Sequence, residues 1–161
     1  MHELGKSLIA ESAFAAPGKI LESLSAEAAL AISYPAIPHS IYAELWHTAL
    51  WQQISIDWVE DRPVPIPEHA ADGFPADTTE PWDQLRNRFL AGATQAAAIA
   101  EDTSRLEVTV LCPTVGNPHR TMTVREQLES LAAHNAYHLG RIVLLRQLLN
   151  LWPPPSGGYT W

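Results

Sequence analysis

The segment at residues 123–149 restricts the fold of this chain more than any other. Thr123 and Glu126 match a capping box, in which each side chain bonds the backbone N–H of the other residue at the start of a helix. His134 and His138 follow four residues apart, so on a helix they project from one face about one turn apart. This face continues at steps of three or four residues through Leu131, Ile142, Leu145 and Leu149. The pattern predicts a helix, ending near Leu151, whose histidine side is turned toward a core.

Two histidines inside an apolar row need a partner, because an unpartnered buried imidazole costs about 1–3 kcal/mol. A shared metal ion would satisfy both, and hydrogen bonds to backbone or water are the alternative. A third histidine, His47, lies on a second predicted helix, residues 40–59, which Ser40 caps and a proline-rich stretch ends. Its row comprises Ala43, Trp51, Ile54 and Trp58. Taken alone, His47 is interpreted as a hydrogen-bonded core residue.

Length and composition predict one domain, residues 1–161, in a soluble chain with one substantial core. The formal charge of −8 and the pI near 5.2 argue against a nucleic-acid partner, because phosphate binding needs clustered Lys and Arg. The single cysteine, Cys112, excludes an internal disulfide and fits a reducing cytoplasm. No apolar run suits a signal peptide or a membrane span, so we expect a cytoplasmic protein with no membrane partner.

Most of the remaining chain is also predicted to be helical. Residues 2–15 and 17–24 are expected to form two helical pieces, and Ser25 is expected to cap a short third helix before an extended connector at 34–38. Residues 61–80 are rich in Pro, Asp and Glu and predict a loop over the helices, with a solvated His69. A further helix is expected from Pro81 to about residue 101. Its core-facing row has heptad-like spacing and includes the small residue Gly92. This row is expected to pack against other helices and to supply no metal ligand.

Strand character is confined to residues 105–122. Residues 106–111 alternate and are rich in β-branched side chains, and 120–122 could return as a partner strand. Cys112 and His119 lie here and could reach the mouth of a site, with ordinary loop positions as the alternative. The sequence thus predicts an all-α fold, an antiparallel four-helix bundle with one short β-hairpin or extended loop before the last helix. The Pro/Gly/aromatic tail, residues 152–161, is expected to pack on the domain or on a second copy, with a free tail as the alternative.

In such a bundle the histidine rows of two helices can converge on one ion. Three imidazoles leave at least one metal position open, and ligation by nitrogen alone suits Zn, Ni, Cu or Fe(II). Asn135 stands where a metalloprotease motif needs Glu, and Leu131 stands where the second motif of a di-iron site needs Glu, so a mononuclear site fits the residues better. Glu44 lies one turn before His47 and is interpreted as a partner of a ligand or a general base, with a surface or capping role as the alternative.

Two motifs resemble the DinB/YfiT-like superfamily of metal-binding four-helix bundles. Pro38-His-Ser-Ile-Tyr followed by Leu45-Trp-His47 resembles the start of the second helix of that family, and His134-Asn-Ala-Tyr-His138-Leu-Gly-Arg resembles its last helix. The tail is similar to an ending found in one branch. The resemblance implies an up-down-down-up bundle, often dimeric, with His47, His134 and His138 on one divalent ion, commonly Zn or Ni. Relatives include thiol transferases that use bacillithiol or mycothiol, an isomerase and proteins named as hydrolases.

Two functions follow as hypotheses. In the first, the protein is a metal-dependent enzyme acting on a small molecule, by thiol transfer with a low-molecular-weight thiol or by hydrolysis, with Glu44 or Tyr137 beside the ligands. In the second, the ion clamps two helices in a non-catalytic binding or dimerisation module, and the protein is a homodimer. Access to the ion separates them: a site sealed by Trp46, Trp51 and Trp58 would favour the second hypothesis.

Overall fold

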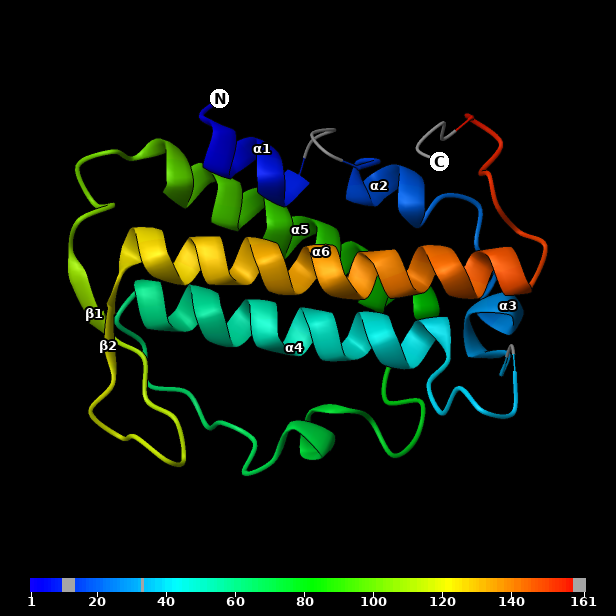
Figure 1. Ribbon diagram of the computed structural model, residues 1–161, viewed down its shortest axis with the longest axis horizontal. Coiled ribbons are helices and arrows are strands. Elements are labelled where there is room, and N and C mark those ends of the chain that lie inside the picture. Colours follow the sequence, from blue (N-terminus) through cyan, green and yellow to red (C-terminus); the bar gives the residue numbers. More distant parts are fainter. Residues whose placement is uncertain (10–13, 33, 158–161) are drawn as a thin grey trace.

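Figure 1 shows the computed structural model, in which residues 1–9, 14–32 and 34–157 are described. The chain is mostly helical and has one two-stranded sheet, in agreement with the predicted helical fold and short hairpin. In chain order the elements are α1 (Glu3–Ile9), α2 (Pro17–Ile20), α3 (Ala26–Leu30), α4 (Ile41–Val59), the 3-10 helix η1 (Ala70–Gly73), α5 (Trp82–Glu101), β1 (Thr109–Leu111), β2 (Thr121–Thr123) and α6 (Val124–Leu148). Within the described ranges, none of these helices combines the length and the apolar character that crossing a membrane requires.

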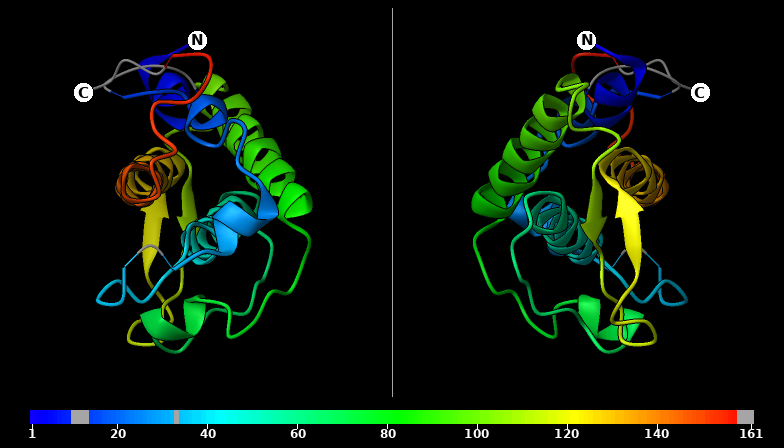
Figure 2. Two further views of the ribbon diagram at one scale, coloured as in Figure 1. Left: turned by 90° about the vertical axis from the view of Figure 1, so that its right-hand side faces the viewer. Right: turned by 90° about the vertical axis from the view of Figure 1, so that its left-hand side faces the viewer.

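The long helices α4 and α6 lie side by side and run in opposite directions (Figure 1). Helix α5 packs against α4 and runs in the same direction as α4, while α1 lies along α5 and α6. Because α4 and α5 are parallel, the chain needs a long connection between them, and this loop carries η1. The end views in Figure 2 place this loop and the hairpin on the same side of α4, away from α1 and α2.

The hairpin pairs β1 with β2 in antiparallel register, with Val110 opposite Met122. The predicted strand at residues 106–111 is shorter than expected, because Arg105 and Val108 form a turn. The carbonyl groups of Leu106 and Val108 in this segment accept hydrogen bonds from the first N–H groups of α6. This segment therefore completes the N-terminus of α6 instead of extending the sheet.

Three predicted helix caps are confirmed. Ser25, Ser40 and Thr123 each accept a hydrogen bond from the third residue of the helix that follows, and Thr123 forms the full capping box with Glu126.

Three helix ends were predicted too far along the chain. Of the helix expected at 2–15, residues 10–13 lie outside the described residues, and Phe14 and Ala15 are not helical. Helix α2 stops at Ile20 instead of residue 24, and Ser23 has a positive φ of 54°. Helix α6 stops at Leu148 instead of near Leu151, because Asn150 takes a left-handed conformation, with a φ of 58°.

The apolar core consists of two clusters at opposite ends of the α4–α6 pair. Ile54, Trp58 and Leu128 belong to the cluster near the hairpin, and Leu45 and Ile142 to the cluster near α2 and α3. Between them lies a layer of buried polar side chains on α4 and α6, which we call the polar layer: Glu44, His47, Thr48, Gln52, Asn135 and His138. Polar groups are buried at a net cost unless they are paired, so the hydrogen bonds of this layer decide whether the fold tolerates it.

One part of the polar layer ties three helices together. Asn135 on α6 donates to the side-chain oxygen of Gln52 at 3.0 Å, and Gln52 donates to the carbonyl of Phe89 on α5 at 2.8 Å. Gly92 leaves room for this link, because a Cβ at residue 92 would collide with the amide nitrogen of Gln52.

Gly92→Ala is therefore expected to lower the free energy of unfolding by about 1–3 kcal/mol, since Gln52 must give up its buried bonds. Urea denaturation of the two proteins measures the difference. Gly116→Ala is the matched control, because a Cβ there meets nothing within 4 Å, and its stability should change by less than about 0.5 kcal/mol. Equal loss of stability in both variants would contradict the role of Gly92.

Candidate metal centre

The structure brings His47 of α4 and His134 and His138 of α6 together at the polar layer. One nitrogen from each imidazole lies within 4.8 Å of the others, an arrangement that could hold a metal ion. The ring centroids of His134 and His138 are 4.6 Å apart, and that of His47 is 5.3 Å from the first and 4.6 Å from the second. His47 and His138 are buried and His134 is half-buried. The i, i+4 spacing on α6 and the antiparallel contact with α4 together produce this cluster.

The Nδ1 atoms of two histidines are engaged by protein oxygens. Nδ1 of His47 donates to the carbonyl of Gly73 at 2.9 Å, and Nδ1 of His138 donates to Glu44 at 2.7 Å. These bonds leave Nε2 of both rings free to act as a ligand. Nε2 of His134 lies 3.3 Å from Nε2 of His47. Carbonyl and carboxylate partners on the far ring nitrogen are the usual way in which proteins orient histidine ligands of a metal.

Glu44 is fully buried and joins two residues of α6. One carboxylate oxygen accepts from His138, and the other accepts from Arg141 Nε at 2.9 Å and Nη2 at 2.7 Å. Tyr137 is 62% exposed, and its ring edge lies against His138. Its hydroxyl accepts a 3.4 Å bond from Arg141. Glu44 therefore orients a histidine directly, whereas Tyr137 acts on the cluster only through its neighbours.

Burial and charge set the protonation of this cluster. Burial alone raises the pKa of Glu44, but the hydrogen bonds from His138 and Arg141 and the positive charge of Arg141 outweigh it, and the net pKa of Glu44 is lowered. Burial is also the main reason that the pKa of His47 is lowered and that the pKa of His134 falls to about 4. The resulting state at neutral pH is an ionised Glu44 beside neutral His47 and His134, and neutral imidazole is the form that binds a metal.

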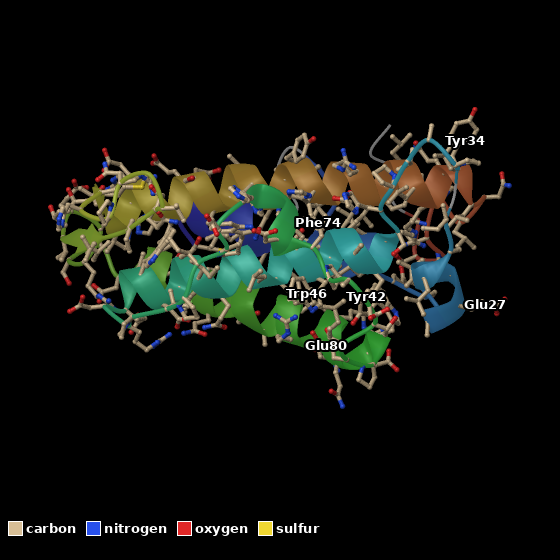
Figure 3. All side chains as sticks on the ribbon, turned by 90° about the horizontal axis from the view of Figure 1, so that it is seen from below. Glu27, Tyr34, Tyr42, Trp46, Phe74 and Glu80 are labelled. Carbon is tan, nitrogen blue, oxygen red and sulfur yellow. The ribbon has the colours of Figure 1, made fainter. Side chains whose placement is uncertain are left out.

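A segment that the sequence predicted only as a loop covers the cluster. Phe74 follows η1, and its ring stacks between His39 and His47, with centroid distances of 3.9 and 4.1 Å. Figure 3 shows Phe74 beside η1, over α4 and α6, and the far end of the same loop at Glu80 near Tyr42. There the hydroxyl of Tyr42 accepts from the backbone N–H groups of Thr79 and Glu80 at 3.1 Å. The segment from Phe74 to Glu80 thus contacts α4 at both of its ends.

The sequence interpretation did not assign Gly73, Phe74 or Arg141 to the site. Gly73 leaves little space, because a Cβ there would lie 3.0 Å from Nδ1 of His47. Arg141 follows His138 at i+3, so helical spacing alone could have identified it. No comparable spacing signal exists for Gly73 and Phe74, which reach His47 across a long loop.

Other residues considered from the sequence lie apart from the cluster. Cys112 is fully buried in the apolar core, where burial raises its pKa, and His119 is exposed on the hairpin. His69 is exposed in the loop before η1, as predicted.

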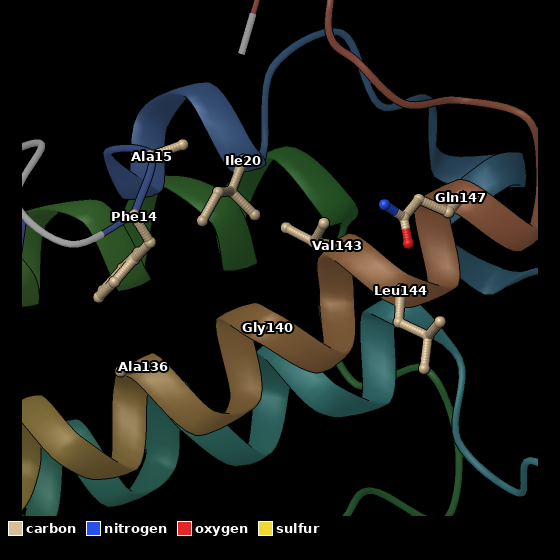
Figure 4. A pocket seen from close by; sticks show the side chains of 8 residues that line it. All are labelled: Phe14, Ala15, Ile20, Ala136, Gly140, Val143, Leu144 and Gln147. Atoms are coloured by element: carbon tan, nitrogen blue, oxygen red, sulfur yellow. The ribbon is translucent and has the colours of Figure 1, made fainter. Parts of the chain in front are cut away.

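Two cavities differ in their relation to the histidines. A cavity of about 180 Å³ between α4, α6 and the hairpin has His134 in its wall, together with Trp51 and Trp58. A larger cavity of about 370 Å³ lies along another face of α6 and is lined by Phe14, Ala15, Ile20, Ala136, Gly140, Val143, Leu144 and Gln147 (Figure 4). It has no ionisable side chain in its wall. Only the smaller of these two has a histidine of the cluster, His134, in its wall.

The donor set fits a divalent transition metal. Three imidazole nitrogens from two helices, two of them oriented by oxygen partners, suit ions that accept nitrogen ligands. Helix α5 contributes no ligand to this cluster, in agreement with its predicted packing role. The three histidines could therefore hold a metal ion.

Comparisons with known proteins identify the family. The model of the DinB superfamily matches residues 18–142, which include α4, α5 and the histidine pair of α6. Comparisons with curated proteins and with solved structures gave no match. The family match covers most of the chain and contains all three histidines of the cluster. The chain belongs to the DinB superfamily.

Proposed function

We propose that the protein is a metal-dependent enzyme that acts on a small molecule through a mononuclear centre held by His47, His134 and His138. The observation that carries this proposal is the convergence of three imidazoles beside a cavity whose wall includes His134. Trp51 and Trp58 line that cavity together with His134. A cavity that reaches one histidine of the cluster favours an enzyme over a module in which the ion only clamps two helices.

The same proposal includes the architecture around the site. α1 and α2 together take the place of the first helix of a four-helix bundle, and α4, α5 and α6 are the others. The directions of these elements, with α4 and α5 parallel to each other and opposite to α1 and α6, support the up-down-down-up order. The two helices that carry the histidines are then antiparallel neighbours.

A divalent ion, with Zn or Ni as the first candidates and Fe or Cu as alternatives, would lower the pKa of a bound water or thiol and so supply a nucleophile near neutral pH. The protein's own residues hold the ligands in place: Glu44 orients His138 and the carbonyl of Gly73 orients His47. The reactions proposed are thiol transfer from a low-molecular-weight thiol and hydrolysis, both on a small electrophile.

The metal requirement is tested by loading the protein separately with Zn and Ni, removing unbound metal and measuring the bound metal by elemental analysis. About one ion per chain is expected for the unaltered protein, and nearly none for His138→Ala. His119→Ala is the matched control, because His119 is exposed on the hairpin, and it should retain the ion. Equal metal content in both variants would refute the site.

Turnover is tested by comparing loaded and chelated protein against panels of thiol-transfer and ester or amide hydrolysis substrates. We expect activity that is lost on chelation, restored by one of the two metals and absent from His138→Ala. An ion bound stoichiometrically without turnover in either panel would overturn the enzymatic proposal and leave the clamp between α4 and α6.

A further inference from the structure

The cavity next to His134 has several polar side chains in its wall. It lies where the hairpin folds against α4 and α6, and the hairpin and the loop carrying η1 lie on the same side of α4 (Figure 2). Its volume is about 180 Å³, which suits a small molecule or one end of a larger one. The side chains that matter for its chemistry are Trp58, Thr114, Arg120, Gln127, Ser130 and His134.

Arg120 brings an unbalanced positive charge to this wall. Arg120 is half-buried, and its guanidinium group donates to the carbonyl of Cys112 at 3.4 Å and to the sulfur of Met122 at 2.7 Å. Within the described residues, Arg120 has no carboxylate partner, although the chain carries a formal charge of −8. The arginines that do pair with a carboxylate are Arg62, Arg86, Arg88, Arg105, Arg125 and Arg141.

Arg146, which also lacks a carboxylate partner in the described residues, donates to backbone carbonyls of Ile20 and Leu151. Arg120 therefore stands apart from the other arginines: it lines a cavity, it is partly removed from water, and neither of its contacts carries charge. A guanidinium group in such a place binds a carboxylate strongly, because its planar donors match both oxygens.

Several residues with a buried polar atom that lacks a hydrogen-bond partner belong to the same cavity wall. Within the described part of the chain they are Trp58 Nε1, Gln127 Oε1, His134 Nδ1 and Asn135 Oδ1, and the first three belong to residues in the cavity wall. Trp58 is 6% exposed and Gln127 is 3% exposed. Each unpartnered buried group costs about 1–3 kcal/mol, so a polar ligand that pairs with them recovers a substantial free energy.

We propose that this cavity binds the carboxylate end of a small organic acid, with the carboxylate on Arg120 and on the indole N–H of Trp58. The inference deepens the proposed function, on which it rests for the role of the bound acid as substrate. Gln127 can accept a hydrogen bond from a hydroxyl or amide of the ligand, and the rest of the molecule extends along the wall to His134. A single guanidinium balances one negative charge, which favours a carboxylate over a phosphate dianion.

The binding test uses chelated, metal-free protein, so that a metal ion cannot capture the probe. Propionate, propionamide and inorganic phosphate are titrated separately, and the shift of the Trp58 indole N–H signal is followed by NMR, with Trp58→Phe identifying the signal. Propionate is expected to shift it saturably and propionamide to bind at least about 10-fold more weakly, because charge-assisted hydrogen bonds are lost. Equal affinity for acid and amide, or tighter binding of phosphate, would overturn the assignment.

Arg120→Gln supplies the second arm and should weaken propionate binding at least about 10-fold. Arg125→Gln is the matched control, because Arg125 is exposed and paired with Glu107, and its affinity for propionate should not change. Circular dichroism checks that both variants fold. If Arg120→Gln does not fold, Arg120→Lys replaces it. Lysine keeps the positive charge but lacks the paired N–H donors, so propionate binding should weaken severalfold. Unchanged affinity in the folded Arg120 variant would refute the proposal.

The two proposals fail separately. If the metal site is refuted, metal-free protein can still bind propionate. If the carboxylate site is refuted, the metal content of the loaded protein is unchanged.

Discussion

Glu44→Ala is expected to lower the free energy of unfolding by about 3–5 kcal/mol and the metal affinity by about 10–100-fold. Glu44 is fully buried and accepts hydrogen bonds from both His138 and Arg141. Its removal leaves Nδ1 of His138 facing a small void inside the protein and leaves the half-buried Arg141 without its carboxylate partner. Urea denaturation of the metal-free protein measures the first effect, and competition with a chelator of known affinity measures the second.

Two further variants separate charge from shape. Glu44→Gln keeps the volume and one acceptor oxygen, so its loss of stability should be smaller than that of Glu44→Ala. Glu107→Ala removes an exposed carboxylate that also pairs with an arginine, and it should cost less than about 1 kcal/mol and leave metal affinity unchanged. An unchanged metal affinity in Glu44→Ala would show that the carboxylate does not orient His138.

Arg146→Met is expected to lower the free energy of unfolding by about 3–5 kcal/mol without changing the metal content. Arg146 is 2% exposed; it donates to the carbonyl of Leu151 at 3.0 Å from Nε and 2.8 Å from Nη2, and to the carbonyl of Ile20. It thereby connects α2, the end of α6 and Leu151, and its guanidinium group lies 5.4 Å from the ring centroid of Trp152 in the tail. Methionine preserves much of the apolar stem, so the variant isolates the loss of the guanidinium contacts.

Thermal and urea denaturation measure the effect of Arg146→Met, with Arg88→Met as the control. Arg88 pairs with Glu80 near the surface, so its replacement should cost less than about 1 kcal/mol. A small loss of stability in Arg146→Met would mean that solvent readily satisfies the carbonyl groups of Ile20 and Leu151.

Local periodicity predicted the helices and placed the histidines on rows that could converge, and the family resemblance assigned all three to one ion. The three- and four-residue steps around His47, His134 and His138 define one face of each helix, and packing those faces together brings the imidazoles close. The helix starts at Ser40 and Thr123 were predictable for the same reason, since a cap involves residues only three apart.

What the sequence did not predict depends on contacts between distant segments. Gly73 and Phe74 meet His47 through a loop, and Arg120 reaches the cavity from a hairpin, so no fixed spacing connects them with α4 or α6. The ends of α2 and α6 were predicted wrongly for another reason. Ser23 and Asn150, which follow these helices, have left-handed backbone conformations, and neither residue type requires such a conformation.

The polar layer also affects how the molecule opens. Because it interrupts the apolar core, the hairpin end and the α2–α3 end are joined by the backbones of the long helices and by a few directional side-chain contacts. Amide protons at the two ends should then exchange with solvent in separate cooperative units. A ligand bound to the histidines connects the two units and should slow amide exchange at both ends together. Binding at the centre would then be measurable in residues far from it.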